Sequence, residues 1–216
     1  MAKPADSSTI ERVNLSEKTL NVAGYRCIAI VNCVAGTPVV FLHGYSYTAS
    51  VWQRIGATAL LADKSIPFLA LDMPYGAKSE CQPKTRDVEA NLSVARAAVE
   101  KIFGAEVPVL VGASLGGGIA LHYAAMFPVK GLLLVAPARA LEESLLKSYS
   151  HFVFPVRIIW GTEDNIISGE EMRTLAEKLP NAKLVMYEDS GHSAHIMQPE
   201  RFKRDLLELY AAAEQS

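Results

Sequence analysis

The sequence predicts an α/β fold, in which a mainly parallel central sheet carries helices on both faces. Short apolar runs, typical of strands buried on both faces, alternate with segments that repeat apolar residues at helical spacing. Such alternation favours a parallel sheet, because each crossover helix returns the chain to the same end of the sheet. With 216 residues, of which 50% are hydrophobic, we expect one well-buried domain over residues 1–216.

The expected elements follow one another with little interruption. Residues 10–15 and 25–31 are predicted to form an antiparallel hairpin at the sheet edge, with a turn at Ala23-Gly24. The further expected strands are 38–42, 66–71, 107–111, 131–136, 155–160 and 183–187. The expected helices are one capped by Thr48 with a stripe of Trp52, Ile55 and Ala59, then 84–103, 115–126, a segment near 141–150, and helices through 172–179 and 202–210.

One serine stands at the tight turn between the strand at 107–111 and the helix at 115–126. Gly112 and Gly116 flank Ser114 at two residues on either side, where strand and helix approach so closely that a Cβ would collide. Such a turn exposes the serine hydroxyl. It also points the free N–H groups of the following helix at it, where they would stabilise an anion.

Two further loops carry the groups that a serine nucleophile needs. A serine hydroxyl is a weak nucleophile until a base takes its proton, and the base needs a third group to fix its tautomer. His192 follows the last expected strand, and Asp164 follows the strand at 155–160. Glu163 is an alternative to Asp164 as the acid.

These pieces together resemble the α/β-hydrolase family, from about Pro38 to the final helix. The matching segments are Phe41-Leu42-His43-Gly44, Asp72-Met73-Pro74-Tyr75-Gly76, Gly112-Ala113-Ser114-Leu115-Gly116-Gly117, Trp160-Gly161-Thr162-Glu163-Asp164 and Ser190-Gly191-His192. The order serine, acid, histidine is that of the family, and the spacing from Gly161 to Asp164 matches the family's acid loop. The resemblance therefore implies the α/β-hydrolase fold with the catalytic residues Ser114, Asp164 and His192.

The resemblance also assigns supporting residues. The backbone N–H groups of Tyr45 and Leu115 would form the oxyanion hole, while His43 would hold the backbone of its loop. Tyr47 and Tyr75 are expected to contact substrate.

Four polar residues near these motifs are expected to play no catalytic part. Asp72 is predicted to be structural, because Pro74 and Gly76 mark a turn after it. The other three are histidines. His122 is expected to be a buried and hydrogen-bonded helix residue, His151 a surface residue, and His195 only a neighbour of the catalytic histidine.

A helical cap domain is not expected. Many relatives insert one before the strand at 155–160. Here only residues 137–154 lie between the strands at 131–136 and 155–160, which is enough for a single helix. The site should then be open to water, which suits hydrolysis of an accessible ester or thioester.

Composition excludes several classes of partner. The formal net charge of −2 gives no basic surplus for nucleic acid, and no apolar run is long enough to span a membrane. The three cysteines, Cys27, Cys33 and Cys81, form no C-x-x-C pair, so we expect neither a disulfide framework nor a zinc site. No cofactor or metal is expected, and a cytoplasmic location fits best.

The sequence thus predicts a carboxylesterase that acts on small acyl esters through an acyl-enzyme. A thioesterase, a monoacylglycerol-type lipase or a perhydrolase would use the same triad, and these alternatives stay open. A ligand receptor without activity is the alternative outside enzymes, because fold does not fix function.

Overall fold

The computed structural model describes residues 16–215, which form one eight-stranded sheet in the order β1-β2-β4-β3-β5-β6-β7-β8. From β4 to β8 all neighbours are parallel, whereas β2 is antiparallel to both β1 and β4. The predicted α/β class is confirmed. The strands are β1 (Ser16–Val22), β2 (Tyr25–Asn32), β3 (Val39–Leu42), β4 (Phe68–Leu71), β5 (Val109–Ala113), β6 (Gly131–Val135), β7 (Val156–Gly161) and β8 (Ala182–Tyr187).

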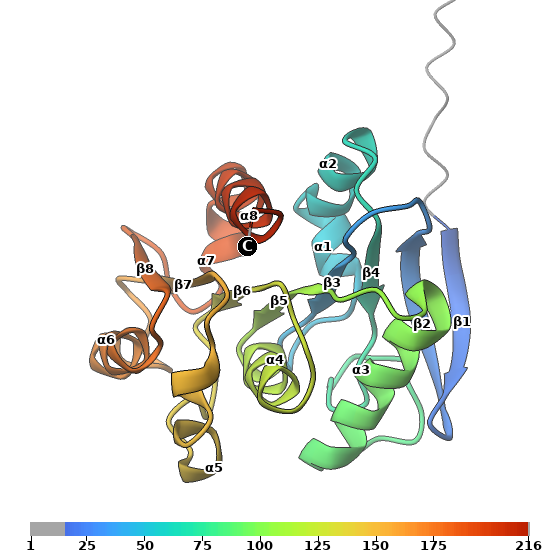
Figure 1. The fold of residues 1–216 in the computed structure, drawn as a ribbon, viewed down its shortest axis with the longest axis horizontal. Helices are drawn as coiled ribbons and strands as arrows, with labels where there is room; N and C mark the ends of the chain where they lie inside the picture. The colour runs from blue at the N-terminus through green and yellow to red at the C-terminus, as the bar shows by residue number, and fades with distance from the viewer. Residues whose placement is uncertain (1–15, 216) are drawn as a thin grey trace, which may run out of the picture.

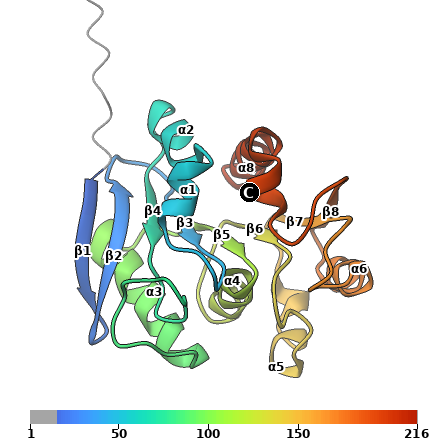
Figure 2. The same ribbon diagram turned by 180° about the vertical axis from the view of Figure 1, so that it is seen from behind.

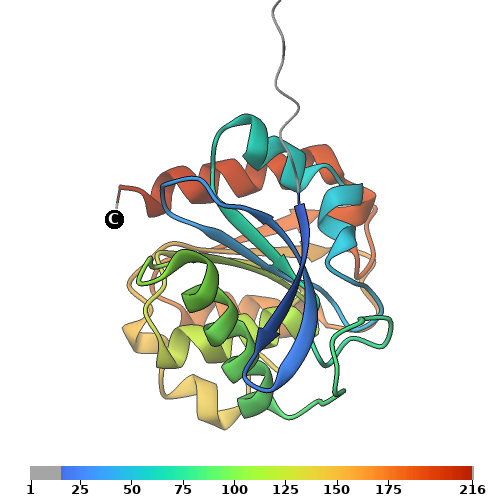
Figure 3. The same cartoon turned by 90° about the vertical axis from the view of Figure 1, so that its right-hand side faces the viewer.

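Helices cover both faces of the sheet (Figures 1 and 2). α1, α2, α7 and α8 lie on one face, and α3, α4, α5 and α6 lie on the other. Figure 3 looks onto the β1 edge and shows α8 crossing one face, with α3 and α4 beneath the other. The helices are α1 (Ser50–Arg54), α2 (Ala57–Asp63), α3 (Val88–Phe103), α4 (Leu115–Met126), α5 (Glu143–Leu146), α6 (Gly169–Lys178), α7 (Ala194–Met197) and α8 (Pro199–Ala213).

Each central strand contributes to two hydrophobic cores, because successive side chains point to opposite faces. In β3, Val39 and Phe41 pack with the α1, α2 and α8 layer, while Val40 and Leu42 pack with the α3 and α4 layer. All four are fully buried. Burial on both faces explains why β3 is a continuous apolar run.

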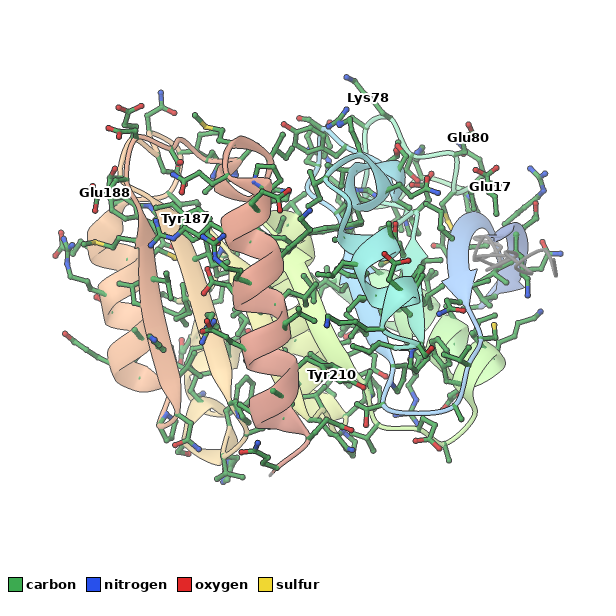
Figure 4. The ribbon with its side chains drawn as sticks, turned by 90° about the horizontal axis from the view of Figure 1, so that it is seen from above. Glu17, Lys78, Glu80, Tyr187, Glu188 and Tyr210 are labelled. Carbon is green, nitrogen blue, oxygen red and sulfur yellow. A yellow bond between two sulfur atoms is a disulfide. The ribbon has the colours of Figure 1, made fainter. Side chains whose placement is uncertain are left out.

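The loops that carry the candidate residues gather at the carboxyl end of the parallel strands. In Figure 4, Lys78 in the loop after β4 and Glu188 in the loop after β8 lie toward the same end, away from Tyr210 near the far end of α8. Parallel strands bring their carboxyl ends to one edge, so loops distant in sequence become neighbours there.

The edge hairpin is present with a different first strand. β1 (Ser16–Val22) pairs with β2 from Ser16 opposite Val31 to Val22 opposite Tyr25, around the predicted turn at Ala23-Gly24. The strand predicted at 10–15 lies outside the described residues.

The helix predicted after Thr48 differs in two respects. No side chain of residues 16–215 caps it, neither that of Thr48 nor any other; the N–H of Ala49, the residue before the helix, donates to Asp72 Oδ1 at 2.6 Å. The helix is then broken at Gly56, whose φ of 74° lies outside the helical region and separates α1 from α2.

Two other predicted helices are shorter than expected. α3 begins at Val88, not near residue 84, because the Asp87 side chain accepts the Ala90 N–H at 2.7 Å and caps the helix there. The segment near 141–150 contains only α5 and a 3₁₀ turn at Tyr149–His151.

The expectation that no disulfide forms is wrong. Cys27 in β2 is bonded to Cys81, and both are fully buried, while Cys33 is free and exposed. An antiparallel bridge between the neighbouring residues Arg26 and Gln82 holds the loop after β4 against β2 and sets the two cysteines side by side.

Among the helices of residues 16–215, none is long and apolar enough to cross a membrane.

Candidate active site

Ser114 stands at the apex of the turn between β5 and α4, with φ 51° and ψ −116°. A positive φ is costly for a residue with a side chain, so the surrounding contacts must enforce it. The two flanking glycines allow the strand, the turn and the helix to approach one another closely. A Cβ on Gly112 would lie 2.4 Å from the Gly116 carbonyl oxygen, and one on Gly116 would lie 2.2 Å from the Leu42 carbonyl oxygen. The strand, the turn and the helix are therefore locked together around Ser114.

His192 and Asp164 are paired. Nδ1 of His192 lies 2.8 Å from Asp164 Oδ2, and because a carboxylate only accepts, Nδ1 is the donor. The Asp164 side chain is fully buried, and its Oδ1 accepts the N–H groups of Ile166 and Ile167 at 2.8 and 3.1 Å. The neutral ring then presents Nε2 as an acceptor. Glu163 is exposed and is not the partner of His192.

A close approach of two loops brings this pair together. Gly161, the last residue of β7, lies against the loop after β8, where a Cβ would be 2.2 Å from the Ser190 carbonyl oxygen. The Glu163 N–H donates to that same oxygen at 2.9 Å, and the Thr162 N–H donates to the Tyr187 carbonyl at 3.0 Å. Any side chain at 161 would push the acid loop away from His192.

Ser114 and His192 line one cavity of about 410 Å³, together with Tyr45, Tyr47 and His195 among others. Within residues 16–215 no hydrogen bond joins the Ser114 hydroxyl to the imidazole, a separation common in ligand-free sites that tighten around substrate. The Tyr47 hydroxyl lies 3.1 Å from Ser193 Oγ, which ties this wall to the His192 loop.

The loop after β3 is held so that the Tyr45 N–H is free. The Gly44 carbonyl accepts hydrogen bonds from His43 Nδ1 at 2.8 Å and from the Tyr47 N–H at 3.1 Å. In a trans peptide the C=O and N–H point in opposite directions, so the Tyr45 N–H is turned away from these donors. Neither it nor the Leu115 N–H, at the first turn of α4, donates a hydrogen bond to any of residues 16–215.

His43 and Asp72 form the support beneath that loop. The Met73 N–H donates to His43 Nε2 at 3.0 Å, which makes the ring neutral with its proton on Nδ1, and burial lowers the pKa of His43. The Asp72 carboxylate accepts the N–H groups of Ala49 and Glu80. Both residues thus have the structural contacts that the sequence predicts for them.

A second cavity, of about 420 Å³, adjoins the first at Tyr45, which lines both. Leu115 and Tyr75 line the second cavity. The Tyr75 hydroxyl donates to the His43 carbonyl at 2.5 Å, and burial raises its pKa well above the usual range. Tyr47 and Tyr75, both expected to contact substrate, therefore line different cavities.

Sequence reasoning missed the surroundings of His195 and the cavity beside His122. His195 is 2% exposed, packs against the Trp52 and Phe202 rings, and lines the cavity of Ser114 with both ring nitrogens unpaired within the described chain. Burial lowers its pKa to about 3, with His192 and Arg54 adding to the effect. His122 lies 3.4 Å from Glu142 and lines the second cavity. For His195, the available sign of burial in the sequence was its two apolar neighbours, Ala194 and Ile196.

No three His, Cys, Asp or Glu side chains of residues 16–215 converge as the ligands of a metal ion would.

Comparison with known proteins decides the family. Residues 39–155, more than half of the chain, match the model of the "Alpha/beta hydrolase family". The chain belongs to the α/β-hydrolase family. Within this family it is 27% identical over 188 residues to human Protein ABHD14A, which covers 85% of this chain and 67% of that protein. It is 25% identical over 173 residues to human "Putative protein-lysine deacylase ABHD14B", covering 79% of this chain and 81% of that one.

Solved α/β-hydrolase structures share the fold. A "predicted CIB-like hydrolase" from Thermoplasma acidophilum superposes with a TM-score of 0.81 at 24% identity, over 91% of this chain and 97% of that one. An esterase from Exiguobacterium antarcticum gives a TM-score of 0.73 at 17% identity, over 89% and 98%. The likeness to these structures extends beyond the segment matched by the family model.

Proposed function

We propose that this α/β-hydrolase is a serine hydrolase that cleaves carboxylic esters through an acyl-enzyme on Ser114. The observation that carries the proposal is the 2.8 Å pairing of His192 with the buried Asp164 carboxylate, in a cavity that Ser114 also lines. A buried carboxylate keeps Nδ1 protonated, which leaves Nε2 free to accept the serine proton.

Acylation comes first. Ser114 Oγ attacks the ester carbonyl carbon while its proton passes to His192 Nε2. The oxyanion that forms is stabilised by the N–H groups of Tyr45 and Leu115, aided by the positive end of the α4 dipole. The bond to the leaving alkoxide then breaks, and His192 donates the proton to that oxygen.

Deacylation repeats these steps with water. His192 takes a proton from water, whose oxygen attacks the acyl carbon, and the Ser114 oxygen leaves and recovers the proton. The free acid departs, and the enzyme returns to its starting state. The Asp164 carboxylate offsets the charge of the imidazolium.

The test is Ser114→Ala, assayed on p-nitrophenyl acetate and with a fluorophosphonate probe. We expect wild type to be labelled once, at Ser114, and the variant to lose labelling and at least about a thousandfold in turnover. Ser93→Ala, an exposed serine on α3, is the control and should keep both. Retained activity in Ser114→Ala would reject the proposal, and an inert Ser114 in wild type would favour the ligand receptor.

A second candidate is removal of acyl groups from lysine, favoured by the similarity to the protein named as a putative protein-lysine deacylase. The same groups would act, with His192 protonating an amine in place of an alkoxide. Acyl-lysine peptides, acyl thioesters and peroxide acceptors assayed beside the esters separate these activities.

A cytoplasmic location stays a prediction, and the Cys27–Cys81 disulfide counts against it, since disulfides persist mainly in oxidising compartments.

A further inference from the structure

The second cavity has apolar walls and lies directly beyond the oxyanion residues. Its walls include Val88 of α3 and Leu115 and Ile119 of α4. Its volume of about 420 Å³ falls within the range of small-ligand sites, roughly 300–1,000 Å³. Tyr45 lines both this cavity and the one that contains Ser114, and Leu115, the residue after Ser114, also lines this cavity, so the two cavities are neighbours beside Ser114.

The position of His192 assigns the second cavity to the acyl side of the substrate. In the proposed reaction His192 protonates the leaving oxygen, so the leaving group must lie on the His192 side. His192 lines the first cavity and is not among the residues that line the second. The acyl group, on the other side of the carbonyl carbon, is therefore the part that extends past Leu115.

Arg86 provides an uncompensated positive charge at this cavity. Its guanidinium lies 4.7 Å from the centre of the Tyr45 ring, and Nη2 donates to the Tyr45 hydroxyl at 2.5 Å. Within residues 16–215 it forms no ion pair with a carboxylate. Because a guanidinium has five N–H donors, most of its donors remain available to a ligand.

The other charged groups around the cavity leave the balance positive. Arg139 is paired with Glu142, and that carboxylate also lies 3.4 Å from His122. Burial lowers the pKa of His122, so His122 adds no positive charge at neutral pH. Asp87, next to Arg86, is engaged as the cap of α3. Within the described residues, the exposed Arg86 guanidinium thus lines this cavity without a counter-ion.

We propose that the acyl group of the substrate ends in a carboxylate, with its chain against the apolar walls and its charge bound by Arg86. The substrates would be half-esters of dicarboxylic acids. A guanidinium binds a carboxylate through two parallel hydrogen bonds, which fixes the orientation as well as the charge of the end group. This inference rests on the proposed ester hydrolysis.

The test compares two p-nitrophenyl esters of equal length, the half-ester of adipic acid and the neutral ester of hexanoic acid. We expect wild type to favour the charged ester in kcat/KM by about five- to tenfold, and added salt to reduce this ratio. Arg86→Gln should abolish the preference, and Arg86→Lys, which keeps the charge but not the paired hydrogen bonds, should keep only part of it. Arg173→Gln, an exposed change of equal charge on α6, should leave it unaltered.

The ratio is the decisive readout, because Arg86→Gln also frees Tyr45 and can slow both esters alike. Equal preference in wild type and Arg86→Gln would overturn the inference, as would a wild type that favours the neutral ester. Binding of free adipate, measured by calorimetry, tests the same site without turnover. If wild type binds adipate more tightly than Arg86→Gln does but hydrolyses no ester, the proposed function fails and the anion site stands; if adipate binds equally to both, the anion site fails.

Discussion

Asp164→Asn tests the His192–Asp164 pair with almost no change of volume. The new amide has two possible orientations. If its oxygen keeps the N–H groups of Ile166 and Ile167, its NH₂ faces His192 Nδ1 and forces the ring proton onto Nε2, where it cannot accept from Ser114. If the amide turns around, its NH₂ faces the N–H groups of Ile166 and Ile167, and these two donors lose their acceptor. The first orientation is therefore favoured, and with it the wrong tautomer.

We expect kcat for ester hydrolysis to fall by about 10³- to 10⁴-fold, the size of loss that a wrong histidine tautomer causes in another serine hydrolase triad. Circular dichroism and thermal unfolding should show a folded protein, so that the loss reports the chemistry. Glu163→Gln is the matched control: it removes the neighbouring exposed carboxylate and should keep full activity. An Asp164→Asn variant with more than a tenth of wild-type kcat would refute the role of Asp164, and inactivity of Glu163→Gln would transfer that role to Glu163.

Three further predictions concern stability. Gly116→Ala should lower the free energy of unfolding by about 2 kcal/mol or more, since its Cβ would lie 2.2 Å from a backbone oxygen of central strand β3. Gly191→Ala is the control and should change that free energy little, because the nearest atom to its Cβ would be 3.8 Å away. Equal urea midpoints for the two variants would contradict this prediction. His195, with its pKa lowered by burial to about 3, stays neutral in the fold while the unfolded chain protonates below about 6.5, so stability should fall as pH drops from 6.5 toward 3, by up to ~1.4 kcal/mol per pH unit. His195→Phe should flatten that slope and the exposed His151→Gln should not; an unchanged slope in His195→Phe would count against the buried neutral ring. Finally, iodoacetamide should alkylate one cysteine, Cys33, in the unfolded protein before reduction. Reduction of Cys27–Cys81 should lower the free energy of unfolding by ~4 kcal/mol, because the bond closes a loop of 54 residues. Alkylation of three cysteines before reduction would exclude the disulfide.

The parts of the fold that the sequence predicts are those set by local pattern. The buried strands β3, β4, β5 and β6 are continuous apolar runs, and α4 spans the predicted range, Leu115–Met126. The tight turn at Ser114 is also local, since its two glycines lie within five residues of each other. The preference for Asp164 over Glu163 rests on family spacing, and the structure places Asp164 against His192.

The parts that sequence reasoning missed depend on contacts between distant residues. The Cys27–Cys81 bond follows from a bridge between β2 and a loop about fifty residues later, which no spacing rule gives. The helix after Thr48 has no side-chain cap from the described residues, and the N–H of the residue before it, Ala49, donates to Asp72. Capping rules assume a neighbour in sequence, whereas here the acceptor comes from the adjacent strand end.

The same division separates catalysis from substrate choice. The proposed catalytic groups sit on short turns fixed by Gly112, Gly116 and Gly161, where a single Cβ would meet backbone within 2.4 Å, so their geometry is rigid. The second cavity instead combines Tyr45, Arg86 and α4, which belong to three separate segments of the chain. Substitution at Arg86 can therefore change the end group that is accepted without displacing Ser114 or His192. It follows that loss of charge preference with retained labelling of Ser114 is the result that separates the two parts of the site.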